Sequence, residues 1–294
     1  MKLYAPEYYL NFKCVADKCE HSCCIGWEID IDKSALDNYK DIPFSYGQEI
    51  RNSIDFNGTP HFRLGENEHC PHLNENGLCK IIINCGEEYI CDICREHPRF
   101  YNFTNFGKEV GIGLSCEAAC DLIIQSDNFD NIIEIGEVVG DIDECDFNAL
   151  ESRDIVFRIL KDPSLRIDGK IEMLYDYFDV FLYNYSFESI ISKLEYLNDE
   201  HKSLFSKAKY LIWNDEISDE LTRILAYFVF RHCSEACDFD EFCISLSFAI
   251  FCTGLISSLA DRLNISEIAR IVSEEIEYSQ ENTDMIKSLF CLTT

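Results

Sequence analysis

The sequence predicts a mainly α-helical protein whose N-terminal region is irregular and rich in cysteine. Eleven of its seventeen cysteines lie in the first 120 residues, among turn signals and short strand patterns. From about residue 150, apolar residues instead recur at helical spacing. We therefore expect a cysteine-rich region over residues 1–125, with a few short strands, and an acidic helical region over residues 126–294 that could pack as one unit with the first.

Short elements are expected along the N-terminal region. Residues 1–13 are predicted to be extended, because Pro6 disfavours a long helix. The alternation over residues 27–32 predicts a strand, and residues 34–39 predict a short helix with Ser34 as its cap. Residues 41–68 are rich in turn signals and are predicted to form loops with a weak hairpin.

The next stretch is predicted to mix turns, strands and one helix. Asn76-Gly77 indicates a tight turn between two cysteines. Residues 107–114 and 132–139 have strand patterns, and residues 116–123 have a helical pattern that Ser115 is placed to cap.

Amphipathic stripes predict the helices of the C-terminal region. They lie at residues 171–182, 187–197 and 221–228, and Asn264 marks the start of a further helix. The uncharged stretch over residues 244–260 contains four serines and a threonine, and a membrane span needs about 20 predominantly apolar residues. We expect this run to be a buried core helix.

The chain is strongly acidic, with a formal net charge of −29. Nucleic acids and anionic membranes bind basic surfaces, so we expect neither as a partner. Such a charge instead favours a cationic, lysine-bearing polypeptide, unless it serves only solubility. The N-terminal residues lack the apolar core of an export signal, so we expect a cytoplasmic protein.

Clustered cysteines in a reducing compartment favour metal binding over disulfides. The first cluster has the spacing C-x4-C-x3-C-C, and its adjacent Cys23 and Cys24 suit metal ligation better than a disulfide framework. Groups of four thiolates hold either zinc or an iron–sulfur cluster. We therefore expect one or two metal centres to nucleate the N-terminal region, with disulfides or plain buried thiols as the alternative.

Four sequence blocks occur in order along this region: FKCVADKCEHSCCIGWEIDIDK, CPHLNENGLCKI, CREHPRF and LSCEAA. Together they resemble the flagellin lysine-N-methylase family, which belongs with the broader group of cysteine-rich proteins regarded as zinc- or iron-chelating. The resemblance covers roughly residues 4–120. By this resemblance the metal ligands are Cys14, Cys19, Cys23, Cys24, Cys70, Cys79, Cys94 and Cys116.

Three further cysteines, Cys85, Cys91 and Cys120, lie outside the family pattern, so the choice between Cys91 and Cys94 as a ligand stays open. The resemblance implies an iron–sulfur cluster of the [4Fe–4S] type, with zinc as the alternative. It also implies transfer of methyl groups from S-adenosylmethionine to flagellin lysines. The rival hypothesis is a non-enzymatic metal-chelating or redox-sensing protein that binds a protein partner.

The methyl donor has no evident binding motif. Gly111-Ile112-Gly113 is too short for the glycine-rich turn of a Rossmann-type methyltransferase. Lysine methylation also needs a neutral amine, so a base or orienting group is expected. The candidates are Glu28, Asp30, Asp32, Tyr4, Tyr8 and Tyr9, against the alternative that the acids face solvent and the tyrosines pack.

Other polar residues near the cysteines are expected to lie beside the site or in solvent, against the alternative that a histidine replaces a thiolate ligand or an arginine donates to the cluster sulfurs or to a cofactor carboxylate. This applies to His21, His69, His72 and His97, to Trp27 as an anchor of the cysteine loop, and to Arg95 and Arg99 as salt-bridge partners. Cys233 and Cys237, at helical i,i+4 spacing, are expected to be ordinary buried or half-buried thiols.

Overall fold

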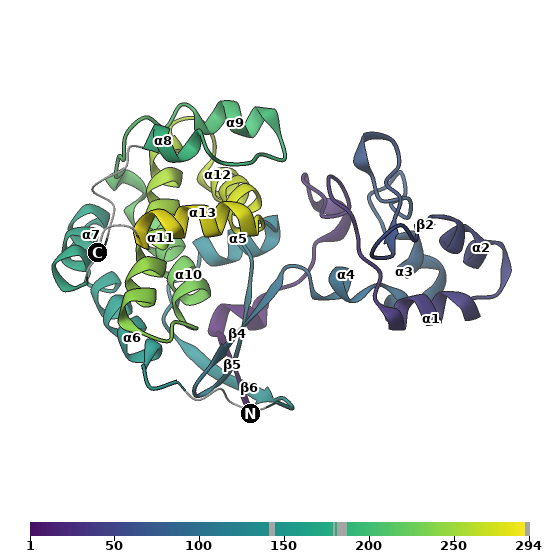
Figure 1. Ribbon diagram of the computed structural model, residues 1–294, viewed down its shortest axis with the longest axis horizontal. Helices are drawn as coiled ribbons and strands as arrows, with labels where there is room; N and C mark the ends of the chain where they lie inside the picture. Colours follow the sequence, from purple (N-terminus) through teal and green to yellow (C-terminus); the bar gives the residue numbers. More distant parts are fainter. Residues whose placement is uncertain (141–144, 179, 181–186, 292–294) are drawn as a thin grey trace. The chain divides into compact units, whose positions relative to one another are not determined.

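The computed structural model describes residues 1–140, 145–178, 180 and 187–291, and it divides into two compact units (Figure 1). The helical unit comprises residues 1–12 and 99–294, and the cysteine-rich unit comprises residues 13–98. This division differs from the boundary expected near residue 125. Residues 99–125 belong with the helices because their strands pair with the N-terminal strand, a long-range contact that local sequence patterns do not reveal.

A four-stranded mixed sheet lies in the helical unit, in the order β4-β5-β1-β6. β4 (Arg99–Thr104) and β5 (Gly107–Ile112) form a hairpin, β1 (Lys2–Pro6) runs parallel to β5, and β6 (Ile132–Glu137) is antiparallel to β1. The strands expected at residues 107–114 and 132–139 are therefore confirmed, and the extended N-terminus is confirmed for residues 2–6. The short 3₁₀ turn η1 (Glu7–Asn11) follows β1.

Gly111 has a packing role in this sheet. It stands opposite Phe100 in the β4–β5 register, and a Cβ atom at Gly111 would lie 2.3 Å from the Phe100 ring. The absence of a side chain lets the ring lie across the strand, as aromatic residues do over glycines in other sheets. The glycine thus serves the sheet.

The other regular elements that the structure describes in the helical unit are helices, which agrees with the predicted mainly α class. They are α5 (Glu117–Ile124), α6 (Ala149–Leu160), α7 (Ile167–Tyr177), α8 (Phe187–Ile191), α9 (Asp199–Phe205), η5 (Asp215–Ile217), α10 (Ser218–Cys233), α11 (Phe239–Leu259), α12 (Ile265–Val272), the π-helical turn η6 (Ser273–Glu277) and α13 (Gln280–Cys291).

The centre of this unit is α11, which packs against α10, α12 and α13 (Figure 1). Its residues from Ser245 to Ser257 are all buried, so the predicted core helix is confirmed. Within the described residues, α11 is long and apolar enough to cross a membrane by length and composition, but 89% of its most apolar stretch is buried inside the unit. A core helix passes the same test, so this is weak evidence for a span.

Several local predictions for the helical unit hold and others need correction. Asn264 caps α12 by accepting a hydrogen bond from the Ser266 N–H. Ser115 does not cap α5: Cys116 occupies the cap position, and the Ser115 hydroxyl has no hydrogen-bond partner among the described residues. The stripe predicted over residues 171–182 ends as a helix at Tyr177, and Leu182 lies outside the described residues.

The cysteine-rich unit consists of short elements. They are η2 (Ala16–Lys18), α1 (Lys33–Asp41), α2 (Phe44–Asn52), β2 (Ile54–Asp55), β3 (His61–Phe62), η3 (Glu66–Glu68), α3 (Lys80–Cys85), η4 (Glu87–Tyr89) and α4 (Asp92–Glu96). The helix expected near residues 34–39 is confirmed as α1, and the weak hairpin as β2–β3. α2, which begins after Pro43, was not predicted.

The prediction of a strand over residues 27–32 is wrong. These residues are all described, and the one bridge they form joins Asp30 to His61. The alternation itself is real, since Ile29 and Ile31 are buried in the core of this unit. The extended chain ends at Asp32 because Asp32, and not Ser34, caps α1 by accepting from the Ala35 N–H.

Candidate metal centre

The core of the cysteine-rich unit is built around Tyr39 of α1, which is 1% exposed. Its ring packs near Phe62, and its hydroxyl lies 3.3 Å from the Cys91 sulfur. Cys70 and Cys91 are buried in the same cluster, and Cys24, Cys79 and Cys85 pack against it. Thiols therefore form part of the core itself.

The segment from Cys70 to Cys79 is a tight loop closed by backbone and side-chain hydrogen bonds. Leu73 forms a bridge with Cys79, and the Asn74 side chain accepts from the N–H groups of Asn76 and Leu78. Gly77 takes a φ of +75°, which favours glycine, so the predicted tight turn is confirmed. The turn returns the chain so that Cys79 lies beside the strand-like start of the loop.

Cys24 is tied to this loop by the backbone. The Cys70 N–H donates to the Cys24 carbonyl at 2.8 Å, and Ile25 forms an antiparallel bridge with His69. Two cysteine blocks that are 46 residues apart in sequence therefore meet through a local β-type pairing.

Two of the thiols are surrounded by backbone donors. The Cys70 sulfur accepts hydrogen bonds from the N–H groups of His72 and Leu73, and the Cys79 sulfur accepts from those of Ile81 and Ile82. Burial nevertheless raises the pKa of Cys70 to about 12 and also raises that of Cys79. Both sulfurs are therefore protonated near pH 7, and the N–H groups around them would stabilise the negative charge of a thiolate.

Two further pairs of cysteines in this unit are in contact with each other. A hydrogen bond from Cys23 lowers the pKa of Cys24 to about 7, despite burial. Cys91 and Cys94 share a hydrogen bond that lowers the pKa of Cys91 and raises that of Cys94. The charges of Cys24 and Cys70 also act on Cys94, which places these two sulfurs, with that of Cys91, within electrostatic reach of Cys94.

We call Cys24, Cys70, Cys79, Cys91 and Cys94 the thiol cluster. Four of its members belong to the predicted ligand set, and the structure adds Cys91, which the family pattern leaves out. Cys14, Cys19 and Cys23 lie in the preceding loop, and Cys116 lies in the helical unit at the start of α5. Among the described residues, no three His, Cys, Asp or Glu side chains are arranged closely enough to define a preformed metal site.

The thiol cluster fits a thiolate-ligated cation in its donor chemistry. It supplies soft sulfur ligands, backbone N–H groups that stabilise negative sulfur, and a low-dielectric surrounding. Burial and the charges of neighbouring cysteines raise the pKa values of Cys70 and Cys79, so a bound cation would have to displace protons from these two residues. Zinc and iron–sulfur clusters both satisfy this donor set.

The residues beside the thiol cluster hold it in place. Trp27 donates its indole N–H to the Cys23 carbonyl at 2.7 Å and packs edge-on against His97, so it anchors the cysteine loop as expected. Asp32 accepts from the N–H groups of both Ala35 and Asp92, which joins the start of α1 to the turn that carries Cys91. Asp32 thus acts as a structural link.

Two of the histidines near the cysteines, His72 and His97, have buried rings. His72 is 1% exposed and lies between the Ser53 hydroxyl (2.9 Å) and the Tyr46 hydroxyl (3.2 Å). Burial lowers the pKa of both His72 and His97 to about 4, so both rings are neutral near pH 7.

The other residues proposed as bases lie in different environments. Tyr8 is buried in the core of the helical unit, and the Tyr9 hydroxyl accepts from Arg99, whose guanidinium also lies over the Tyr9 and Phe12 rings. Tyr4 lies in β1, while Glu28 and Asp30 are exposed. Arg95 pairs with Asp92, so the predicted salt bridge is confirmed for Arg95.

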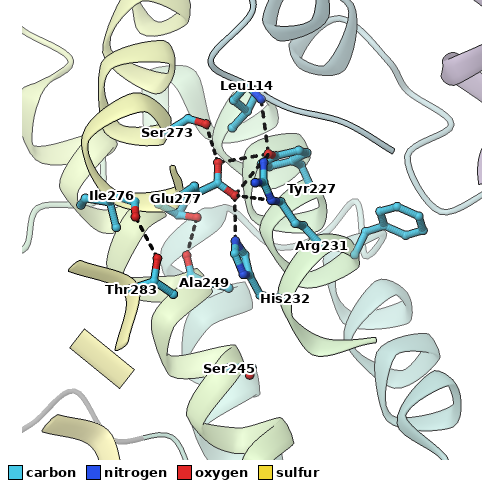
Figure 2. A network of polar contacts seen from close by, with 12 residues as sticks. Leu114, Tyr227, Arg231, His232, Ser245, Ala249, Ser273, Ile276, Glu277 and Thr283 are labelled. Atoms are coloured by element: carbon cyan, nitrogen blue, oxygen red, sulfur yellow. Dashed lines mark hydrogen bonds and ion pairs between the residues drawn. The ribbon is translucent and has the colours of Figure 1, made fainter. Parts of the chain in front are cut away.

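A second polar cluster, which the sequence analysis missed, lies inside the helical unit (Figure 2). The fully buried carboxylate of Glu277, in the π-helical turn, accepts from the Tyr227 hydroxyl (3.0 Å), the Ser273 hydroxyl (2.6 Å) and the His232 ring (2.7 Å). Arg231 pairs with the same carboxylate at 3.3 Å. The signal available in sequence was the i,i+4 spacing of Tyr227 with Arg231 and of Ser273 with Glu277.

Charge is balanced within this cluster. Burial acts to raise the pKa of Glu277, but the Arg231 charge and the His232 and Ser273 hydrogen bonds lower it below its ordinary value. Burial lowers the pKa of His232 to about 4, so its neutral ring donates to Glu277 near pH 7. Arg231 also lies over the Phe100 and Tyr278 rings. The arrangement is a fully paired ion pair that fixes the π-helical turn against α10.

A depression on α2 is lined by Ser45, Gln48, Glu49, Asn52 and Ser53. It is shallow and open, whereas small-molecule cofactors usually occupy concave sites that bury most of the ligand. We therefore assign no methyl-donor site to it.

Comparison with known proteins gives distant and partial relatives. A stretch of 129 residues, 40% of this chain, is 23% identical to the flagellar biosynthetic protein FliU of Salmonella muenchen and covers 75% of that protein. The same identity over 129 residues relates the chain to lysine-N-methylases of Salmonella choleraesuis and Salmonella typhimurium, of which it spans only 31%. No family model matches the chain, and no solved structure is similar to it. The chain is thus related to lysine-N-methylases at a coarse level.

Proposed function

We propose that this protein is a cytoplasmic lysine N-methyltransferase that acts on flagellin with S-adenosylmethionine as methyl donor. The observation that carries the proposal is the thiol cluster, in a chain whose distant relatives are named for flagellar biosynthesis and lysine methylation. We further propose that the cluster holds an iron–sulfur centre, or zinc. The strongly acidic composition suits a lysine-bearing substrate.

Cys24, Cys70 and Cys79, with Cys91 or Cys94, would hold the metal, while Cys14, Cys19, Cys23 and Cys116 remain predicted ligands from the family resemblance. A bound centre would supply folding energy and a positive charge that keeps its thiolate ligands deprotonated. Tyr39 contacts Cys91 and so fixes that thiol toward the others. Asp32 holds the backbone of the Cys91 turn.

The second candidate is a non-enzymatic metal-binding or redox-sensing protein. It rests on the thiol cluster alone, because binding a metal through these cysteines requires no methyl donor. The two candidates differ in a single property, since binding of S-adenosylmethionine is expected only of the enzyme.

The decisive experiment measures metal content and methyl transfer on the same protein. Protein purified without oxygen is assayed for iron, acid-labile sulfide and zinc, and then incubated with flagellin and S-adenosylmethionine carrying a labelled methyl group. We expect bound metal and labelled flagellin, and no labelling of flagellin whose lysines are already blocked. Metal without donor binding or transfer would support the second candidate, and loss of both would reject the thiol cluster as a site.

Serine variants identify the ligands. Cys24→Ser should release the metal, whereas Cys291→Ser, at an exposed thiol in the last helix of the helical unit, should retain it. Comparing Cys91→Ser with Cys94→Ser decides which of these two sulfurs binds, because only the ligand variant should lower metal occupancy. Retention of full occupancy in all three cluster variants would contradict the proposed site.

A further inference from the structure

Cys145 and Cys237 are in contact in the helical unit. Their positions are 92 residues apart in the chain, yet the Cys145 thiol donates to the Cys237 carbonyl at 3.3 Å, and the two thiols share a hydrogen bond. Cys237 is exposed, which corrects the expectation of a buried or half-buried thiol there, whereas Cys233 is fully buried as expected. Cys145 is half-buried.

Both segments are held in this position by contacts on either side. The Asn105 amide donates to the Cys145 and Phe147 carbonyls, each at 3.3 Å, and Phe147 packs against Phe242 of α11. On the other side, the Cys237 N–H donates to the Glu241 carboxylate at 2.9 Å. The pair is therefore placed by the fold.

We propose that Cys145 and Cys237 form a reversible intramolecular disulfide by exchange with a small-molecule disulfide. The inference is independent of the thiol cluster, because both residues lie in the helical unit. Such a bond would join the segment before α6 to the connection between α10 and α11. Disulfide formation requires two sulfurs in near contact and access for the oxidant, and this pair offers both.

The exchange balances in two steps. The thiolate of the exposed Cys237 attacks one sulfur of the small disulfide, whose S–S bond breaks and releases one small thiolate, which leaves a mixed disulfide on Cys237. The Cys145 thiolate then attacks the Cys237 sulfur and releases the second small thiol. The two cysteines together lose two electrons and two protons, and the small disulfide takes up both as it becomes two thiols.

The test treats the full chain with oxidised glutathione, blocks remaining thiols with iodoacetamide, and maps the digest by mass spectrometry. We expect a peptide pair linked through Cys145 and Cys237, which dithiothreitol separates. The linked pair should persist in Cys291→Ser, a matched control at another exposed thiol of the same unit. In Cys145→Ser the exchange should stop at the first step, leaving glutathione attached to Cys237.

Thermal unfolding gives a second readout. The closed loop spans 92 positions, so oxidation should raise the Tm of the wild type by roughly 5–10 °C relative to equally treated Cys145→Ser. The proposal is overturned if wild-type Cys145 stays alkylatable while glutathione accumulates on Cys237. It is equally overturned if Cys237 pairs with any cysteine other than Cys145.

Discussion

The buried carboxylate of Glu277 is expected to contribute about 3 kcal/mol to the stability of the helical unit. Glu277→Gln keeps the size of the side chain but removes the negative charge that faces Arg231 (Figure 2). Removing one partner of a buried ion pair costs roughly 3–5 kcal/mol, because the other charge stays buried without compensation. Arg231 remains stacked on Phe100 and Tyr278, which offsets about 1 kcal/mol of this loss.

Urea unfolding followed by far-UV circular dichroism measures this loss, because most helices belong to the helical unit. The matched control is Glu281→Gln, the same change at an exposed position in the first turn of α13, which should cost less than about 1 kcal/mol. Adding Arg231→Met to Glu277→Gln should recover part of the loss, since it removes the uncompensated charge.

The reasoning is refuted if Glu277→Gln unfolds within about 1 kcal/mol of Glu281→Gln. That result would mean that solvent reaches Arg231 well enough to screen its charge once the carboxylate is gone. A double variant less stable than Glu277→Gln alone would argue that Arg231 stabilises the fold by packing on the aromatic rings, and that the ion pair matters little.

Three further predictions concern single elements of the two units. The pKa of His232 falls from 6.5 to about 4 on folding, so below pH 6.5 the unfolded chain binds a proton that the folded protein does not bind. The free energy of unfolding therefore decreases as the pH falls, by roughly 2 kcal/mol between pH 7 and 5. Urea unfolding of His232→Gln at both pH values should show a slope smaller by this amount, and an unchanged slope would contradict the assignment. Asp32→Ala removes the acceptor of two N–H groups and should destabilise the cysteine-rich unit by about 2 kcal/mol in urea unfolding. Asp32→Asn keeps a capping oxygen and should lose less than half of that stability. Equal losses in the two variants would argue against the capping role. Gly111→Ala forces the Phe100 ring to move and should lower the stability of the helical unit by about 1–3 kcal/mol in thermal unfolding. An unchanged stability would show that the ring shifts freely.

The sequence predicted the elements that depend on residues close together in the chain. The uncharged run at residues 244–260 became α11 because apolar residues on every side of a helix require burial on every side. Asn264 marked the start of α12, and Asn76-Gly77 marked the tight turn of the cysteine loop, since capping and positive φ depend on a few neighbouring atoms.

Features that depend on distant contacts could not be predicted in the same way. Asp32 replaces Ser34 as the cap of α1 because its second oxygen also receives the N–H of Asp92, 60 positions away. Cys91 belongs to the thiol cluster because the fold places its sulfur beside the Tyr39 hydroxyl. The spacing of the cysteines in the sequence does not predict this contact. The pairing of Cys145 with Cys237 is of the same kind.

The composition of the cysteine-rich unit argues that its stability and its proposed metal are coupled. Its core of fully buried residues, as far as the structure describes it, contains eleven side chains, and two of them are cysteines. Small cores usually need an additional source of stability, such as disulfides or a metal. In this unit burial raises the pKa values of Cys70 and Cys79, and the charges of neighbouring cysteines add to this rise, so these two residues are compatible with a close-packed core only as neutral thiols or as ligands of a shared cation. A bound cation would offset the repulsion between these sulfurs in the core to which Tyr39 of α1, the Cys70–Cys79 loop and Cys91 all contribute.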